Sequence, residues 1–262
     1  MKNVFLRNGL KIILYFALGS AIVLTGEVIA ALVGPSENFT NPDRSAVDLG
    51  GSGKPLNFVL LGDSTAAGEG TDRSSGIGIK CAQYLAINRP VRFVNLGISG
   101  ARLIDVVQKE LPEVVALNPD IVLIAAGAND GTHFTSGQEI ETQTSELVSF
   151  LKRNRPNIQI IFTGSPDLGG AHRFYQPLRW FAGTQSDRVN RHIELALKNT
   201  NVIFAPLSHN TGAIFRRDPS LLSIDKFHPN KHGYQIWLPT LFRALDEAQA
   251  NLARLRPHKQ IS

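Results

Sequence analysis

Residues 56–64 read Leu-Asn-Phe-Val-Leu-Leu-Gly-Asp-Ser, an apolar run that ends in a glycine and two polar residues. A short continuous run rich in Val, Leu and Phe, followed at once by glycine, is typical of a strand that is buried on both faces. We therefore expect Leu56–Leu61 to be a buried strand and Gly62-Asp63-Ser64 to form a tight turn at its end.

Four more apolar runs follow, and stretches with helical periodicity separate them. Strands that alternate with helices predict an α/β fold in which a parallel sheet is covered on both faces. Right-handed crossovers then bring the carboxyl ends of all strands to one edge, where ligands of such sheets bind. The expected strands are 56–61, 91–96, 121–126, 158–162 and 201–205, and the expected helices lie near 76–88, 101–117, 137–154, 185–199 and 231–254.

The N-terminal segment, residues 1–33, is a basic stretch followed by an apolar run from Ile12 to Val33 that one charge, Glu27, interrupts. The run is long enough for one helical crossing of a bilayer, and the upstream positive charges predict a cytoplasmic N-terminus. We expect an uncleaved signal-anchor, with a cleaved signal peptide or a buried N-terminal helix as alternatives. The first two place the rest of the chain outside the cytoplasm, either on a single membrane-spanning helix or secreted.

Residues 34–55 are rich in Gly, Pro, Ser, Asn and Asp, which is typical of a linker. The predicted organisation is therefore an anchor or signal peptide over 1–33, a linker over 34–55, one α/β domain over 56–254 and a C-terminal tail over 255–262.

The charge pattern argues against a nucleic-acid partner. Lys and Arg total 27 and Asp and Glu total 22, and this formal excess of +5 is not gathered on one segment. The single cysteine, Cys81, excludes an intramolecular disulfide and reads as a small core residue.

Residues suited to nucleophilic catalysis follow the first three predicted strands and precede the last helix. They are Ser64, Gly97 and Asn129 after the strands, and Asp225 with His228 before the helix. A serine hydroxyl is a weak nucleophile until a base takes its proton, and imidazole, with a pKa near 6.5, suits that task at neutral pH. We predict Ser64 as nucleophile, His228 as general base and Asp225 as the acid that orients the imidazole.

Attack on an ester creates an oxyanion, which requires hydrogen-bond donors fixed in advance at its position. The predicted donors are the backbone N–H groups of Ser64 and Gly97 and the side-chain amide of Asn129. Glycine at position 97 lets a substrate approach the backbone closely.

Each feature alone has an ordinary structural explanation. Gly62-Asp63-Ser64 is a common helix start, Gly97 and Asn129-Asp130-Gly131 are common in turns, and Asp225 and His228 are also compatible with a surface ion pair. Their occurrence together, in order and at strand ends, favours catalysis.

The motifs Gly-Asp-Ser, Gly, Gly-x-Asn-Asp and Asp-x-x-His resemble those of the SGNH hydrolase superfamily, also called GDSL lipases or acylhydrolases, over roughly residues 56–245. The resemblance implies a flavodoxin-like α/β/α sandwich with a five-stranded parallel sheet, and hydrolysis of esters or thioesters. It places the family's Ser, Gly, Asn, Asp and His on the five residues named above. Thr65 departs from the family pattern, which has Leu after the serine. The stretch from Ser64 to Gly68 looks like that of bacterial exported members.

Two rival functions remain open: an O-acyltransferase acting on a cell-envelope polysaccharide, and a non-catalytic binding module on a membrane stalk. The expected substrate is a small-molecule, glycan or lipid ester, and no cofactor is expected. We expect no metal either, because Pro229 interrupts the segment between His228 and His232.

A long segment after the fourth strand, residues 164–184, contains several aromatic residues and should border the same sheet edge. One hypothesis is that they shape a pocket for the acyl or leaving group, and the alternative is a lid that packs on its own core. The residues concerned are Phe174, Tyr175, Trp180 and Phe181.

Overall fold

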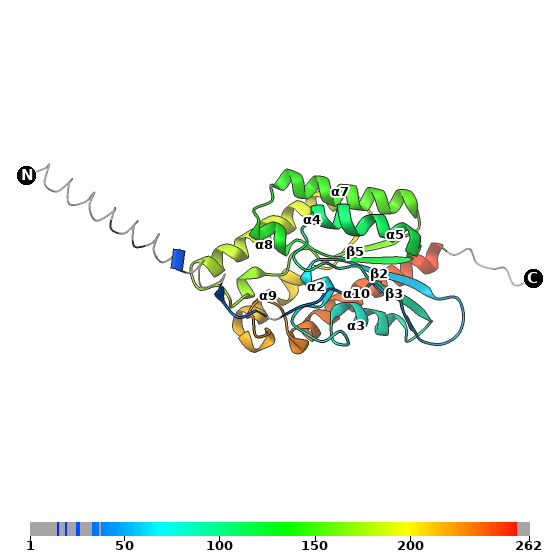
Figure 1. The fold of residues 1–262 in the computed structure, drawn as a ribbon. Helices are drawn as coiled ribbons and strands as arrows, with labels where there is room; N and C mark the ends of the chain where they lie inside the picture. Colours follow the sequence, from blue (N-terminus) through cyan, green and yellow to red (C-terminus); the bar gives the residue numbers. More distant parts are fainter. Residues whose placement is uncertain (1–14, 16–18, 20–24, 27–32, 37, 256–262) are drawn as a thin grey trace, which may run out of the picture.

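The computed structural model describes residues 15, 19, 25–26, 33–36 and 38–255, and Figure 1 shows one sheet between two layers of helices. The predicted membrane-crossing segment, Ile12–Val33, lies almost entirely outside these residues, as does the tail after Leu255. In the part of the chain that is described, no helix combines the length and the apolar character needed to cross a bilayer.

The sheet has six strands in the order β1-β3-β2-β4-β5-β6. Its five parallel strands are the five that the apolar runs predict, so the α/β prediction is confirmed. They are β2 (Leu56–Gly62), β3 (Val91–Asn95), β4 (Ile121–Ala125), β5 (Gln159–Phe162) and β6 (Ile203–Phe204).

The prediction of a purely parallel five-stranded sheet is wrong at one edge. Residues 47–49, assigned to the linker from sequence, form β1 (Val47–Leu49), which pairs antiparallel with β3. Asp48 faces Arg92 across the pair, and their side chains lie 3.3 Å apart. This short edge strand is mostly exposed, so its position depends on pairing and not on the burial that a hydrophobic pattern detects.

The helices cover both faces of the sheet because alternate residues of the central strand point to opposite sides. Phe58 and Leu60 of β2 belong to one core cluster, whereas Val59 and Leu61 belong to the other. The first cluster packs against α3 (Ile77–Leu85), α9 (Leu207–Arg217) and α10 (Lys231–Leu255), and the second against α5 (Leu111–Leu117), α7 (Gly137–Asn154) and α8 (Leu178–Leu197). Figure 1 shows these two sets on opposite sides.

The helices differ from the prediction in several places. Helix α8 begins seven residues earlier than expected, and α9 was not predicted. The expected helix 101–117 is divided into α4 (Leu103–Asp105), a π-helical stretch η1 (Val106–Glu110) and α5. The π-helical stretch carries the buried side chain of Glu110, which reaches the end of β2.

Candidate active site

Ser64 lies at the carboxyl edge of the sheet because β2 ends in a turn that only glycine permits. Gly62 has φ +135°, and a Cβ atom there would lie 1.9 Å from the carbonyl oxygen of Ala125. Asp63 then caps the short helix α2 (Ser64–Ala67), and its carboxylate accepts hydrogen bonds from the N–H and hydroxyl of Thr65 at 2.9 and 2.8 Å. Thr65, the residue that departs from the family pattern, thus stabilises this turn.

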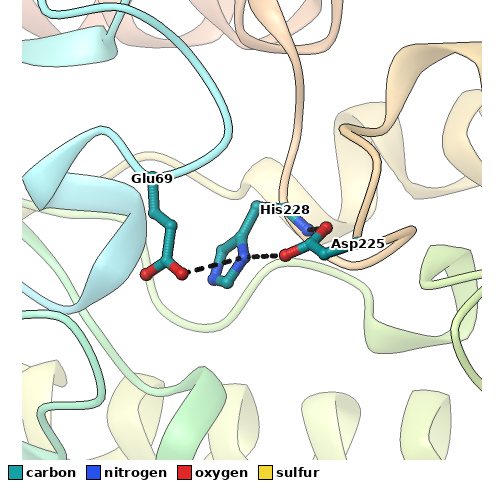
Figure 2. Close-up of side chains that lie close together, drawn as sticks. All are labelled: Glu69, Asp225 and His228. Atoms are coloured by element: carbon teal, nitrogen blue, oxygen red, sulfur yellow. Dashed lines mark hydrogen bonds and ion pairs between the residues drawn. The ribbon is translucent and has the colours of Figure 1, made fainter. Parts of the chain in front are cut away.

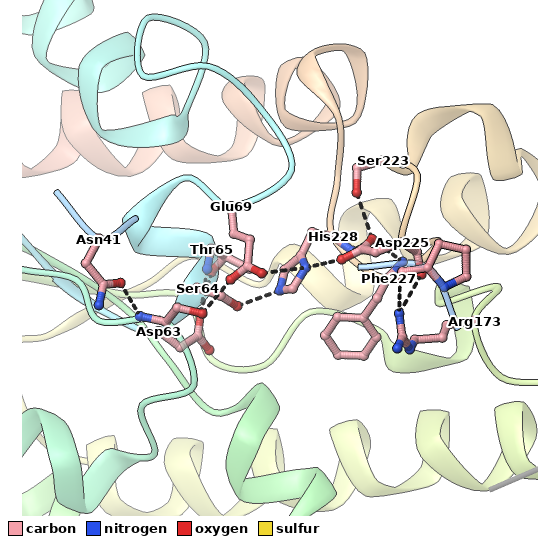
Figure 3. Close-up of polar contacts among 12 residues, drawn as sticks. Asn41, Asp63, Ser64, Thr65, Glu69, Arg173, Ser223, Asp225, Phe227 and His228 are labelled. Atoms are coloured by element: carbon pink, nitrogen blue, oxygen red, sulfur yellow. Dashed lines mark hydrogen bonds and ion pairs between the residues drawn. The ribbon is translucent and has the colours of Figure 1, made fainter. Parts of the chain in front are cut away.

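The imidazole of His228 lies between Ser64 and Asp225, as Figure 3 shows. The Ser64 Oγ lies 2.8 Å from Nε2, and the Asp225 Oδ2 lies 2.6 Å from Nδ1. When Nδ1–H donates to Asp225, Nε2 is left to accept the serine proton. The three residues predicted as nucleophile, base and orienting acid are therefore brought together in the required order.

The second oxygen of Asp225 fixes the loop that carries His228. Asp225 Oδ1 accepts hydrogen bonds from the Ser223 hydroxyl at 2.7 Å and from the N–H groups of Phe227 and His228 at 2.8 and 3.0 Å. Burial acts to raise the pKa of Asp225, but the hydrogen bonds from His228, Phe227 and Ser223 outweigh it and hold this pKa well below its usual range. Asp225 thus remains ionised while it orients the imidazole.

A second carboxylate, Glu69, faces the same imidazole, and sequence reasoning did not identify it. Its Oε1 lies 3.7 Å from His228 Nδ1, and its Oε2 accepts a hydrogen bond from the Ser99 hydroxyl at 2.5 Å. Burial lowers the pKa of His228. The bond to Asp225 and the negative charge of Glu69 raise this pKa by more than burial lowers it, so the net shift is upward.

The Gly97 amide is not available to an oxyanion, contrary to the prediction. Its N–H donates to the side-chain oxygen of Asn95 at 3.0 Å. A Cβ at position 97 would lie 2.7 Å from the backbone nitrogen of Ala67, so glycine is required here for close packing against α2. Its role in the structure is therefore to let this loop approach the serine turn.

Asn129, by contrast, lies in the short helix α6 (Ala128–Thr132), which follows β4. Its Nδ2 donates to the carbonyl of Ala101 at 3.0 Å, which uses one of its two N–H bonds. Gly100 precedes Ala101 in the loop after β3; its φ is +80°, and a Cβ added there would meet no atom within 4 Å. Its N–H makes no hydrogen bond to any residue in the described part of the chain.

Two buried acids below the serine turn were also not predicted as part of the site. Burial raises the pKa of Asp63 to about 6, although the hydrogen bonds from Thr65 oppose this effect. Burial likewise raises the pKa of Glu110 to about 9, and its Oε2 accepts the N–H of Gly62 at 2.7 Å. At neutral pH Glu110 is therefore uncharged and supports the backbone immediately before Asp63.

Glu69, Asp225 and His228 also form a group that could hold a cation, with one ligand atom of each lying within 4.8 Å of the others (Figure 2). However, the short contact between His228 Nδ1 and Asp225 requires a proton between them, whereas a metal ligand must present a free nitrogen. We therefore assign this group to the orientation of the imidazole.

The aromatic residues of segment 164–184 fall into two groups. Phe174 packs edge-on against Phe227 with ring centroids 5.8 Å apart, next to His228. Tyr175, Trp180 and Phe181 are exposed instead, and none of them borders the hollow beside Ser64. Phe174 does not line this hollow either, and it reaches the site only through Phe227, with which it shares a small cluster.

A serine, an imidazole and a carboxylate linked in this order at the edge of a parallel sheet define a serine hydrolase. Residues 60–236 match the GDSL-like lipase/acylhydrolase family, and the chain belongs to this family. It is accordingly a carboxylic ester hydrolase. Over 248 residues it is 29% identical to the GDSL-like esterase Rv1075c of Mycobacterium tuberculosis, which covers 88% of this chain and 78% of that protein.

Solved structures share the fold at lower identity. A catalytic mutant of Axe2, an acetylxylan esterase from Geobacillus stearothermophilus, superposes with a TM-score of 0.58 at 21% identity, covering 74% of this chain and 95% of that one. The lipase Lip_vut3 from a goat rumen metagenome gives 0.56 at 16% identity, covering 72% and 97%. These similarities support the fold of the domain and leave the substrate open.

Proposed function

We propose that this protein cleaves a carboxylic ester through an acyl-enzyme formed on Ser64. The observation that carries the proposal is the continuous hydrogen-bonded series from the Ser64 hydroxyl through His228 to Asp225. His228 Nε2 takes the hydroxyl proton as Ser64 Oγ bonds to the carbonyl carbon, and Asp225 stabilises the resulting imidazolium. His228 then gives this proton to the departing alkoxide, so the alcohol leaves and the acyl group remains on the serine.

Water completes the cycle by the same route in reverse. His228 takes a proton from water, the new hydroxyl bonds to the acyl carbon, and the bond to Ser64 Oγ breaks as the serine recovers its proton. The carboxylic acid is released and the enzyme is regenerated.

For the oxyanion of both tetrahedral intermediates we assign three donors around the serine turn. They are the N–H of Ser64 at the start of α2, the N–H of Gly100 and the second N–H of the Asn129 amide. Gly100 replaces Gly97 in this role because the Gly97 N–H is already bonded to Asn95. Loss of one such donor typically raises the barrier by about 2.7–4 kcal/mol.

A p-nitrophenyl acetate assay on the full chain tests the proposal, with Ser64→Ala and His228→Ala beside the wild type. Each change should lower kcat by about 10⁴-fold or more, while far-UV circular dichroism stays unchanged. Wild-type turnover in either variant would exclude this mechanism. Addition of a sugar alcohol to the assay separates the hydrolase from an O-acyltransferase, because a transferase would yield the sugar ester in place of the free acid.

The membrane-anchored, extracytoplasmic location belongs to the same proposal. It rests on the basic stretch and the apolar run that precede residue 34. Protease accessibility of the domain in intact and opened spheroplasts tests this location, and protection in intact spheroplasts would contradict it.

A further inference from the structure

A small hollow borders the reacting atoms. It measures about 30 Å³, and Ser64 and His228 are among the residues that line it. Its other walls come from the loop after β5 and from helices α9 and α10, with Leu168, Thr211, Phe215 and Trp237 among them. Most of these wall residues are apolar, so the hollow suits a hydrocarbon group.

The far wall of the hollow is part of the hydrophobic core. Phe215, Leu222 and Trp237 are 6%, 8% and 3% exposed and belong to the core cluster beneath β2. The rings of Phe215 and Trp237 pack with centroids 5.8 Å apart. A longer hydrocarbon group in the hollow would therefore have to displace core side chains, and close-packed interiors resist such displacement.

The side wall of the hollow, between the loop after β5 and helix α9, is also fixed in position. A Cβ at Gly170 would lie 2.7 Å from Phe215 Cβ, so the loop after β5 already touches helix α9. Asp167 of this loop forms an ion pair with Arg216 of α9, with two of its contacts at 2.5 and 3.0 Å. Loop and helix thus cannot move apart without breaking a charge-assisted pair.

We propose that this hollow is the acyl site and that it restricts the enzyme to acetyl and propanoyl esters. A space of about 10–15 Å³ accommodates one water-sized group, so 30 Å³ holds roughly two such groups beyond the carbonyl carbon. An acetyl group needs one and a propanoyl group two, whereas an octanoyl group needs seven. The inference rests on the proposed function, since it assigns the acyl half of the ester that Ser64 attacks to this hollow.

The size of the hollow also decides which half of the ester occupies it. A sugar, a polysaccharide or a nitrophenol does not fit 30 Å³, so a bulky alcohol must leave toward solvent. The reverse arrangement, with a methyl alcohol inside and a long acyl chain outside, makes the opposite prediction about acyl length. The preferred substrates are therefore short-chain esters of large alcohols.

A series of p-nitrophenyl esters from acetyl to octanoyl tests the proposal on the full chain. One methylene that does not fit its pocket changes kcat/KM by roughly 10- to 200-fold. We expect acetyl and propanoyl esters to be cleaved with similar kcat/KM, and octanoyl at least about 100-fold less well. Octanoyl cleavage as fast as acetyl cleavage would overturn the acyl site and leave the esterase intact, whereas absence of cleavage of every ester would overturn the proposed function itself.

Two variants that enlarge the hollow locate the restriction, and both are scored by the ratio of butanoyl to acetyl kcat/KM. Leu168→Ala removes most of a wall side chain and Phe215→Leu shortens the far wall, so each should raise this ratio about tenfold or more. Trp180→Ala is the matched control, because Trp180 is exposed and does not line the hollow. A ratio that stays at the wild-type value in both folded wall variants, or that rises equally in Trp180→Ala, refutes the assignment.

Discussion

Replacing Glu69 with glutamine should change the pH dependence of the enzyme in a defined direction. The groups that face His228 are Asp225 on its own loop, Glu69 after helix α2, and Asp63 in the turn before that helix. Glutamine keeps an oxygen that can accept the Ser99 hydroxyl, so the substitution removes the charge and preserves the contact. The neutral imidazole should then persist to lower pH, because one of the anions that stabilise its charged form has gone.

The size of the effect follows from the geometry. Glu69 Oε1 lies 3.7 Å from Nδ1, and the Glu69 and His228 side chains are 17% and 11% exposed. Two unit charges about 4 Å apart interact by about 1 kcal/mol in water and by about 4 kcal/mol at an effective dielectric constant of ~20. We take a value of about 1.4 kcal/mol because the site opens to solvent, which corresponds to about one pH unit. The imidazolium also forms in the transition state, so loss of the same interaction energy there should lower the plateau of kcat/KM about tenfold.

The assay is a profile of kcat/KM against pH with p-nitrophenyl acetate for the wild type, Glu69→Gln and Ser99→Ala. Glu69→Gln should show a lower plateau and an acidic limb displaced by about one unit toward lower pH. Ser99→Ala removes the hydrogen bond but keeps the charge, so its acidic limb should stay in place. Asp63, with a pKa of about 6, titrates in the same range in all three proteins and cancels in the comparison. A Glu69→Gln limb that coincides with the wild type, or moves to higher pH, would refute the electrostatic role.

Three further substitutions test other parts of the site. Asp225→Asn should lower kcat by about 10³–10⁴-fold with little change in KM, because the imidazole loses its ionised partner; a loss below tenfold in steady-state kinetics would contradict this. Glu110 has a folded-state pKa of about 9 against an ordinary 4.5, so wild-type stability should fall as pH rises between these values. Glu110→Gln should remove this dependence. The free energy of unfolding in urea should then exceed that of the wild type by more at pH 9 than at pH 6. Gly62→Ala should destabilise the fold by at least ~3 kcal/mol in the same assay, because its Cβ would meet the carbonyl of Ala125, whereas Gly131→Ala, where the nearest atom is 3.6 Å away, should cost far less.

The sequence predicted those parts of the fold that depend on burial. The apolar run of β2 is buried almost throughout, and the strands that flank it follow the same pattern. Because parallel strands share one carboxyl edge, the polar residues after the strands could be placed together from the sequence alone. Ser64, Asp225 and His228 were correctly expected to meet, although 164 residues separate Ser64 from His228.

What the sequence did not predict depends on contacts between loops. Glu69 lies between two glycines in a polar stretch, where a solvated carboxylate has the same pattern as one that faces an imidazole. Gly97 was assigned to the oxyanion because glycine after a strand suits both a donor and a close contact, and only the position of Asn95 distinguishes them. Helix α9, by contrast, was predictable, because its buried residues Leu207, Thr211 and Phe215 recur every four residues, as on one face of a helix.

Hydrogen bonds to backbone groups fix the loop that carries His228. The Ser223 N–H donates to the carbonyl of His228 at 2.8 Å, which closes the loop on itself. The Asn230 amide donates to the carbonyls of Ser220 and Leu222 at 2.7 and 2.9 Å, while its oxygen caps the start of α10. The imidazole is therefore held by contacts on both sides of its loop, which keep it aligned with Ser64. Because the reacting groups are aligned by the protein itself, the selectivity of this esterase must come from the space around them. The dimensions of the hollow beside Ser64 therefore say more about which ester is cleaved than the geometry of the triad does.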